Sequence, residues 1–159
     1  MTDVVKMLSQ ELGELLRQKG LTISCAESCT GGLLTGCLTE IAGSSDYVMG
    51  SVVSYTNQVK NRIIGVKQTT LAEYGAVSAA VAQEMAEGIR TLIGTDIGVS
   101  VTGNAGPGAS EDKAVGLVYI GVTGKKGTVT GENHFDGNRS AVREQAVEKA
   151  LKMVLEYIE

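Results

Sequence analysis

Two glycine-rich loops, each placed directly after a short apolar segment, constrain the fold more than any other feature of this sequence. The first loop, 26–32, follows the apolar segment 21–26, and the second, 102–108, follows the apolar segment 97–102. Glycine allows tight turns and close approach of a backbone or a ligand. In open α/β sheets, ligands bind outside the carboxyl ends of the strands. We therefore expect both loops to lie at the carboxyl edge of one sheet and to form one binding site there.

The spacing of apolar residues elsewhere predicts a single α/β domain over residues 1–159, with helices and strands alternating along most of the chain. The predicted helices are 3–19, 33–41, 57–65, 68–74, a helix capped by Ser78 that runs through 93, and a helix from 139 to 158 capped by Asn138. The predicted strands are 21–26, 50–55, 97–102, 114–123 and 128–135. The sheet should therefore have about five strands.

Composition excludes several classes of function. The net charge is −4 and no basic run is present, so we expect no nucleic-acid partner. No apolar run reaches the length of about 20 residues that spans a bilayer, and we expect neither a membrane partner nor a signal peptide. Three cysteines without a paired spacing, together with one histidine, predict free thiols, a cytoplasmic location and no metal site. No feature of the sequence calls for a cofactor.

The stretch 43–60 contains a serine and a lysine that we consider as a catalytic pair. Ser45 and Lys60 flank the predicted strand 50–55, and His134 is the only histidine that could serve as a base. Serine attacks at neutral pH only with an adjacent base, and a desolvated lysine can fill that role. We expect Lys60 in the first turn of a helix, where the helix dipole would lower its pKa. The alternative is a chance spacing with a solvated lysine.

Five motifs occur in an order that is characteristic of one family. They are Ala26-Glu27-Ser28-Cys29-Thr30-Gly31-Gly32, Gly43-Ser44-Ser45, Tyr55-Thr56-Asn57 with Lys60, Gly75-Ala76-Val77-Ser78, and Thr102-Gly103-Asn104-Ala105-Gly106-Pro107. With these motifs the chain resembles the CinA C-terminal domain family, which includes stand-alone nicotinamide-nucleotide amidases. The resemblance extends from the first helix to the last. It implies a three-layer α/β/α domain with a mixed, mostly parallel sheet.

The resemblance also implies an activity, namely hydrolysis of the carboxamide of nicotinamide mononucleotide to nicotinic acid mononucleotide and ammonia in pyridine nucleotide salvage. By motif position, Ser45 would be the nucleophile, Lys60 its base and Tyr55 a supporting hydroxyl. The residues expected to bind the nucleotide are Ser28, Cys29, Thr30, Gly31, Gly32, Ser44, Asn57, Thr102, Gly103, Ala105, Gly106 and Arg139. We expect backbone N–H groups near residues 43–45 to bind the oxyanion.

Several alternatives remain open from the sequence. Ser28 or Cys29, at the start of a helix, is a second candidate nucleophile. Arg139 and Arg143 lie one turn apart and form either an anion clamp or a solvent-exposed face balanced by acidic neighbours. The same fold without turnover would be a nucleotide-binding or interaction domain. We expect the assembly to be a homo-oligomer, namely a dimer.

The chain departs from the family pattern at four positions. Ala42 and Ala114 stand where proline is common, Asn104 stands where an apolar residue is common, and Thr56 replaces a serine. None of these changes removes a candidate catalytic group. Asn104 and Ala114 bear on the shape of the second loop.

Overall fold

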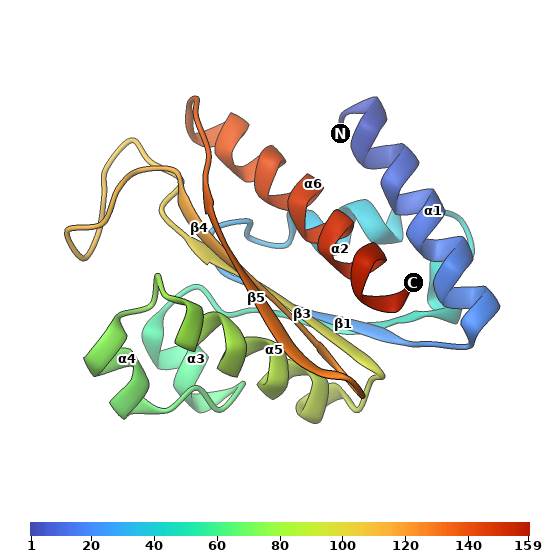
Figure 1. The fold of residues 1–159 in the computed structure, drawn as a ribbon, viewed down its shortest axis with the longest axis horizontal. Coiled ribbons are helices and arrows are strands. Elements are labelled where there is room, and N and C mark those ends of the chain that lie inside the picture. The colour runs from blue at the N-terminus through green and yellow to red at the C-terminus, as the bar shows by residue number, and fades with distance from the viewer.

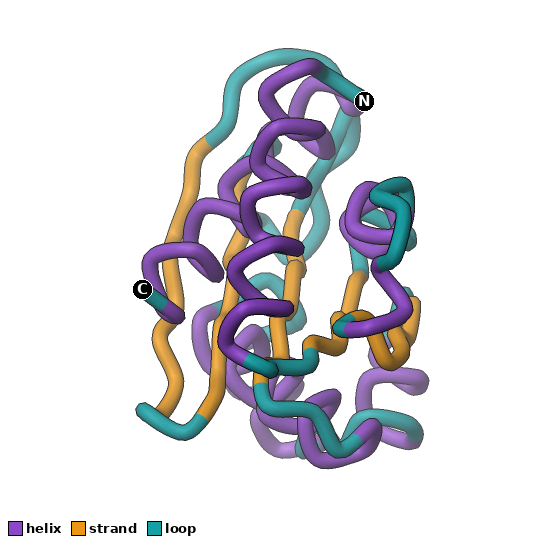
Figure 2. Tube along the Cα trace, turned by 90° about the vertical axis from the view of Figure 1, so that its right-hand side faces the viewer, coloured by secondary structure: helices purple, strands orange, loops and turns teal.

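A five-stranded mixed sheet forms the centre of the molecule in the computed structural model, which describes all residues from 1 to 159 (Figures 1 and 2). The strands are β1 (Ile23–Glu27), β2 (Val48–Val53), β3 (Ile97–Gly103), β4 (Leu117–Gly124) and β5 (Gly127–His134). Their order across the sheet is β2-β1-β3-β4-β5. The strand β1 pairs in parallel with β2 and with β3, whereas β4 is antiparallel to both of its neighbours. Four of the five strands therefore point the same way, as predicted for a mostly parallel sheet.

Helices cover both faces of this sheet and complete three layers (Figure 1). The helices are α1 (Asp3–Lys19), α2 (Leu33–Thr39), α3 (Asn57–Arg62), α4 (Gln68–Tyr74), α5 (Ala79–Ile93) and α6 (Arg139–Ile158), with a short 3-10 helix, η1, at Ser44–Asp46. The helices α1, α2 and α6 share one large apolar core with the sheet, and α5 packs in a second cluster on the opposite face. The predicted three-layer α/β/α domain is confirmed. None of the helices has the length and apolar character needed to cross a lipid bilayer.

Most element boundaries agree with the sequence prediction. The helices 3–19 and 68–74 have the expected bounds, and strand boundaries differ from prediction by up to three residues. Ser78 and Asn138 cap α5 and α6 as predicted, because their side chains accept from the backbone N–H groups of Val81 and Ala141. These caps determine where the core-facing helices α5 and α6 begin.

The helix α2 begins without a capping side chain at its N-cap position. Gly32 occupies the cap position and has no side chain to offer. The carboxylate of Glu27, the last residue of β1, accepts from the backbone N–H groups of Leu34 and Thr35 at 2.9 Å each, and from the Thr35 hydroxyl at 2.6 Å. Glu27 is fully buried. A negative charge at a helix N-terminus is favourable, so Glu27 joins β1 directly to α2.

We expect Glu27→Gln to destabilise the protein by about 2–3 kcal/mol, because one amide oxygen cannot replace two carboxylate oxygens and the new NH₂ group faces donors. Urea denaturation measures the change in free energy of unfolding. The matched control is Glu14→Gln on the exposed side of α1, which should change that free energy by less than about 0.5 kcal/mol. Equal stability of the two variants would contradict the role assigned to Glu27.

Candidate active site

A pocket of about 430 Å³ opens at the carboxyl edge of β1 and β3, where the sequence predicts a binding site. Its volume is within the range of small-molecule sites. Both glycine-rich loops contribute to its wall. The residues that line it are Ser28, Cys29, Tyr55, Thr56, Asn57, Lys60, Ala76, Val77, Thr102, Gly103, Asn104, Ala105, Gly106, Gly108, Ala109, Ser110, Glu111 and Arg139. The prediction that the two loops meet is confirmed.

A buried serine–lysine contact lies at the base of this pocket. Lys60 Nζ is 2.9 Å from Ser28 Oγ, and it also donates to the carbonyl oxygens of Ser54 at 2.9 Å and Tyr55 at 3.3 Å. Lys60 is only 1% exposed, and Ser28 is 8% exposed. No carboxylate pairs with the ammonium, since all of these partners are neutral oxygens. The arrangement places a candidate base within hydrogen-bond distance of a candidate nucleophile.

Parallel pairing of β1 and β2 brings these two residues together. Ser28 directly follows the end of β1, and Glu27 at that end pairs with Val53 at the end of β2. The chain then turns through Ser54 into α3, whose first turn is capped by the Thr56 hydroxyl. Threonine keeps the capping oxygen of the serine it replaces. The Lys60 side chain therefore extends from α3 toward the end of β1, where Ser28 lies.

Burial lowers the pKa of Lys60 to about 8 and is the largest cause of the shift; the Cys29 and Glu111 side chains oppose it. The direction of the pKa shift agrees with the prediction, but the cause does not, because the expected cause was the helix dipole. The helix α3 has only six residues. A neutral amine is thus accessible near physiological pH, as a general base requires.

The structure does not bring Ser45 to Lys60. Ser45 lies in η1, before β2, whereas Lys60 follows β2. The six residues of that strand span about 20 Å, so the two residues occupy opposite edges of the sheet. Ser45 is exposed and does not line the pocket, and Ser44 beside it bonds weakly to the Thr39 carbonyl at 3.5 Å. The expected Ser45–Lys60 pair and an oxyanion site at residues 43–45 have no support in this geometry.

The other predicted residues divide into two groups. Ser28, Cys29, Tyr55, Asn57, Lys60, Thr102, Gly103, Ala105, Gly106 and Arg139 line the pocket, whereas Thr30, Gly31 and Gly32 do not. Thr30 is fully buried, and its hydroxyl has no hydrogen-bond partner. These three residues form the turn that directly follows Ser28 and Cys29 in the chain.

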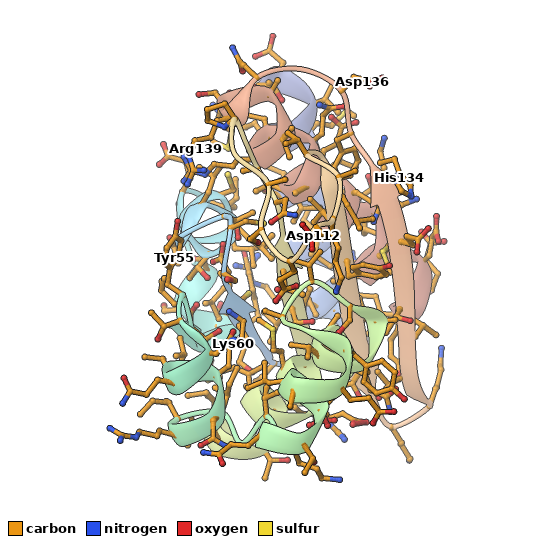
Figure 3. All side chains as sticks on the ribbon, turned by 90° about the vertical axis from the view of Figure 1, so that its left-hand side faces the viewer. Tyr55, Lys60, Asp112, His134, Asp136 and Arg139 are labelled. Carbon is orange, nitrogen blue, oxygen red and sulfur yellow. The ribbon has the colours of Figure 1, made fainter.

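Tyr55 and Arg139 lie at the mouth of the pocket (Figure 3). Tyr55 is 57% exposed, and its hydroxyl accepts from Arg139 at 3.2 Å. Arg139 also donates to the Gly106 carbonyl at 2.8 Å. The Tyr55 hydroxyl makes no bond to Ser28 or Lys60; only its backbone carbonyl does. The structure thus places the Tyr55 side chain with Arg139 rather than with the Ser28–Lys60 pair.

Cys29 lacks the thiolate character that the sequence alternative required. Burial raises the pKa of the Cys29 thiol to about 11, and the nearby Lys60 and Arg143 charges offset this only in part. The thiol therefore stays protonated at neutral pH and is a poor nucleophile. Of the two alternatives at this turn, Ser28 is the one with a base in contact. No group of three or more His, Cys, Asp or Glu side chains has the arrangement of a metal site.

The second loop is held closed by the side chains of Asn104 and Ser110. Asn104 donates to the carbonyls of Ser110 and Lys113, each at 3.2 Å, and accepts from the Ser110 hydroxyl at 2.7 Å. An apolar residue at this position would make none of these bonds. Although Asn104 departs from the family pattern, its side-chain hydrogen bonds hold the loop closed.

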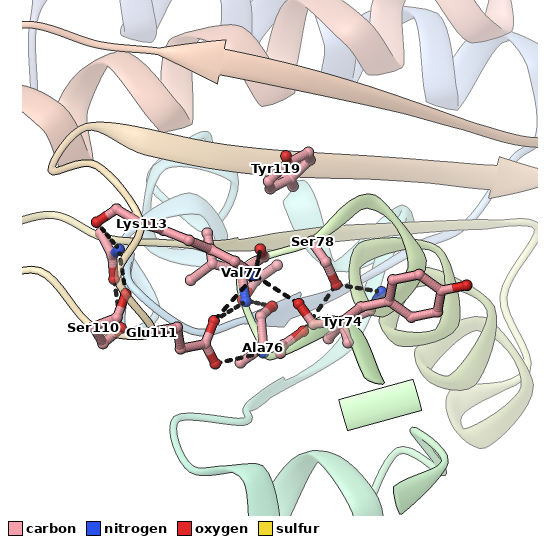
Figure 4. Close-up of polar contacts among 12 residues, drawn as sticks. Tyr74, Ala76, Val77, Ser78, Ser110, Glu111, Lys113 and Tyr119 are labelled. Carbon is pink, nitrogen blue, oxygen red and sulfur yellow. Dashed lines mark hydrogen bonds and ion pairs between the residues drawn. The ribbon is translucent and has the colours of Figure 1, made fainter. Parts of the chain in front are cut away.

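Glu111 fastens the same loop to the segment before α5 (Figure 4). Its carboxylate accepts from the N–H groups of Ala76 at 2.7 Å and Val77 at 3.1 Å, and from Lys113 at 3.3 Å. Lys113 donates in turn to the carbonyls of Tyr74 and Val77, at 2.6 Å each. Although partial burial acts to raise the pKa of Glu111, these hydrogen bonds outweigh it and the pKa is lowered. The contact closes one side of the pocket.

We expect Glu111→Gln to raise KM for the pocket's substrate about 3- to 10-fold and to change kcat little, because the loop contributes wall residues and no reacting group. Hydrogen exchange of residues 105–113 should accelerate in the same variant. Asp112→Asn is the matched control, since the neighbouring Asp112 side chain is exposed and makes no hydrogen bond. A kcat loss without a KM change would show that the loop has a different role.

The fold and the pocket define an α/β domain with a buried Ser–Lys pair at the carboxyl edge of its sheet. The chain belongs to the CinA C-terminal domain family, whose model matches residues 5–158. The predicted family is thereby confirmed.

Individual relatives are similar over nearly the whole chain. A nicotinamide-nucleotide amidohydrolase PncC of Enterobacter agglomerans is 47% identical over 150 residues, which cover 93% of this chain and 92% of that protein. A CinA-like protein of Nostoc punctiforme is 49% identical over 91% of this chain, which spans only 36% of that longer protein. The competence/damage inducible protein CihA of Agrobacterium tumefaciens has a solved structure with a TM-score of 0.96 and 38% identity, covering 100% of this chain and 98% of that one.

Several curated relatives are much longer than this chain. It spans 37% of one relative from Desulforamulus reducens and 36% of one from Bacillus pumilus, whereas it matches PncC over nearly its full length.

Proposed function

We propose that the protein hydrolyses the carboxamide of nicotinamide mononucleotide, giving nicotinic acid mononucleotide and ammonia, with Ser28 as nucleophile and Lys60 as general base. The observation that carries the proposal is the 2.9 Å contact between Lys60 Nζ and Ser28 Oγ in the pocket wall. The 47% identity to a PncC amidohydrolase supports the choice of substrate. The proposal moves the nucleophile from Ser45 to Ser28.

The acylation step follows from the contacts of Lys60. In its neutral form Lys60 accepts the Ser28 hydroxyl proton while Ser28 Oγ bonds to the amide carbon. The carbonyls of Ser54 and Tyr55 stabilise the ammonium that forms. The tetrahedral intermediate then expels ammonia, which takes its third proton from Lys60. Water attacks the resulting ester with Lys60 again as base, and the carboxylic acid product leaves Ser28 free.

The oxyanion requires hydrogen-bond donors close to Ser28. The N–H groups of Cys29 and Thr30 are suitable, because neither donates to a protein acceptor, whereas the N–H of Gly31 is used by the Ser28 carbonyl. The residue after the nucleophile supplies such a donor in other serine hydrolases. We assign the oxyanion to this turn instead of residues 43–45.

The phosphate of the nucleotide needs a cation at a distance from the reacting carbon. Arg139 is the cation at the pocket mouth, and Asn57 and the loop of Gly106 lie beside it in the pocket wall. Two nitrogens of the Arg139 guanidinium donate to the Gly106 carbonyl and the Tyr55 hydroxyl. The remaining N–H groups are free to donate to a phosphate. We therefore place the reacting amide at Ser28 and the phosphate toward Arg139.

A comparison of three substrates tests this assignment. We expect ammonia release from nicotinamide mononucleotide to have a kcat/KM at least 10-fold higher than from nicotinamide riboside, and release from free nicotinamide to be lower still. In Arg139→Ala the preference for the phosphorylated substrate should shrink. Equal rates with and without the phosphate would contradict the proposed substrate, and binding of the nucleotide without ammonia release would favour the non-catalytic alternative.

A further inference from the structure

Arg143 makes contacts that neither sequence-based alternative described. From α6, its Nε donates to the Cys29 carbonyl at 3.1 Å, and one terminal nitrogen donates to the Thr30 carbonyl at 3.0 Å. These carbonyls belong to consecutive residues of the turn that follows Ser28. A planar guanidinium matches such a pair, whereas a lysine presents a single point of contact. Arg143 is thus neither a free anion clamp nor a solvent-exposed residue.

The turn needs an external restraint because its own sequence is permissive. Gly31 and Gly32 both have positive φ, at 59° and 104°, and glycine reaches many other conformations at little cost. Glu27 holds the chain only from Leu34 onward. The Ser28 N–H donates to the Val101 carbonyl, the Gly31 N–H to the Ser28 carbonyl and the Leu33 N–H to the Thr30 carbonyl. The Cys29 carbonyl between them is held by Arg143 alone.

The contact also determines which way the turn's amides face. A trans peptide holds its C=O and N–H on opposite sides. With the Cys29 carbonyl bound to Arg143, the N–H of Thr30 must point away from Arg143. Rotation of this peptide would turn the Cys29 carbonyl, instead of the Thr30 N–H, away from Arg143. A carbonyl there would repel a developing oxyanion.

We propose that Arg143 is a positioning residue that holds the Cys29–Thr30 segment with its amides free for the oxyanion formed at Ser28. The inference rests on the proposed role of Ser28 as nucleophile. Arg143 itself does not line the pocket. Because the oxyanion exists only in the transition state and the intermediate, losing Arg143 should lower kcat and leave KM nearly unchanged.

The kinetic test compares three variants of the full chain with nicotinamide mononucleotide. We expect Arg143→Ala to lower kcat about 10- to 100-fold with KM within about 3-fold, as for a small misplacement of a reacting group. Arg143→Lys should recover part of the rate, because it retains one donor. Lys152→Ala is the matched control, since its exposed cation lies on the same helix in a pair with Glu148. A KM rise with unchanged kcat would overturn the proposal and make Arg143 a substrate ligand.

An analogue of the tetrahedral intermediate separates positioning from a merely structural role. Pyridine-3-boronic acid carries boron where the carboxamide carbon would be and forms a tetrahedral anion with a serine. Arg143→Ala should weaken its binding about 10-fold or more, while the affinity for nicotinic acid mononucleotide stays within about 3-fold. Equal loss of both affinities, together with a lower melting temperature, would show general loosening of the fold and overturn the proposal.

A fluorophosphonate probe keeps this test independent of the substrate. The probe phosphonylates an activated serine and needs the same oxyanion donors. If the wild type is labelled at Ser28 yet releases no ammonia, the proposed substrate is wrong and the labelling rates decide the role of Arg143. Slower labelling of Arg143→Ala, by about 10-fold or more, would support it. Equal labelling of the two proteins, or no labelling of the folded wild type, would overturn it.

Discussion

Lys60→Met should reduce kcat/KM for nicotinamide mononucleotide by about 10²–10⁴-fold, the range expected for loss of a general base. Methionine matches the length of the lysine stem and fills its buried position, but it accepts no proton from Ser28. The expected loss is therefore chemical rather than structural. Steady-state ammonia release measures it, and Lys67→Met, which removes an exposed lysine five residues after α3 ends, is the matched control.

The pH dependence of the wild type should report the same group. With the pKa of Lys60 near 8, about one molecule in ten carries the neutral amine at pH 7. We expect kcat/KM to rise with pH up to about 8 and then to level off. A profile that is flat from pH 6.5 to 9 would contradict the assignment of Lys60 as base.

Stability provides a second readout for Lys60. Its pKa is about 8 in the folded protein and 10.5 in the unfolded chain. Between these values the unfolded chain binds one more proton, so the free energy of unfolding of the wild type rises with pH in this window. Lys60→Met lacks this contribution. The free energy of unfolding of the wild type minus that of Lys60→Met should rise by up to about 1.4 kcal/mol per pH unit between pH 8 and 10. A difference that stays constant over this range would contradict the lowered pKa of Lys60.

Ser28→Ala should lower kcat by on the order of 10⁴-fold or more, as removal of a serine nucleophile does in other hydrolases. The substitution removes one oxygen at a nearly buried position, and Lys60 keeps its two carbonyl partners, Ser54 and Tyr55. We therefore expect the variant to fold and to bind nicotinamide mononucleotide with nearly wild-type affinity. Isothermal titration calorimetry measures that affinity without turnover.

Ser45→Ala is the control that decides between the two serines. Ser45 is exposed in η1 and lies outside the pocket, so this variant should keep more than about half of the wild-type kcat. If Ser45→Ala loses activity and Ser28→Ala does not, the nucleophile is the one expected from motif position and the geometry described here is not that of the working enzyme.

The fold could be predicted because its strongest signals are local. The apolar periodicity of 3–19 and 79–93, and the caps at Ser78 and Asn138, are readable from spacing alone. The meeting of the two glycine loops followed from a rule about strand ends. Boundaries were less certain, since strand ends depend on pairing with neighbours.

The site could be predicted only in part, because partners across the sheet are not readable from spacing. Ser45 and Lys60 are close in sequence, but Ser45 precedes β2 and Lys60 follows it. The extended strand between them therefore keeps the two residues far apart. Ser28 is 32 residues from Lys60 and meets it only because β1 and β2 are parallel neighbours. A strand length of about 20 Å was a signal that argued against Ser45.

Other residues of the site were missed because their partners are backbone groups. Glu27 binds amides of α2, Glu111 binds amides before α5, and Arg143 binds carbonyls of the Ser28 turn. Such contacts depend on the backbone conformation of distant segments. A lone acid at the end of an apolar strand, as at Glu27, was the one available signal, since a buried carboxylate must be satisfied by donors.

The most direct test of the central proposal is the stoichiometry of products formed from nicotinamide mononucleotide by the wild type and by Ser28→Ala. Chromatography of the nucleotides, with an ammonia assay on the same samples, measures it. We expect the wild type to form nicotinic acid mononucleotide and ammonia in equal amounts and Ser28→Ala to form neither above background. Release of free nicotinamide, no reaction by folded wild type, or undiminished ammonia from Ser28→Ala would contradict hydrolysis of the amide by Ser28.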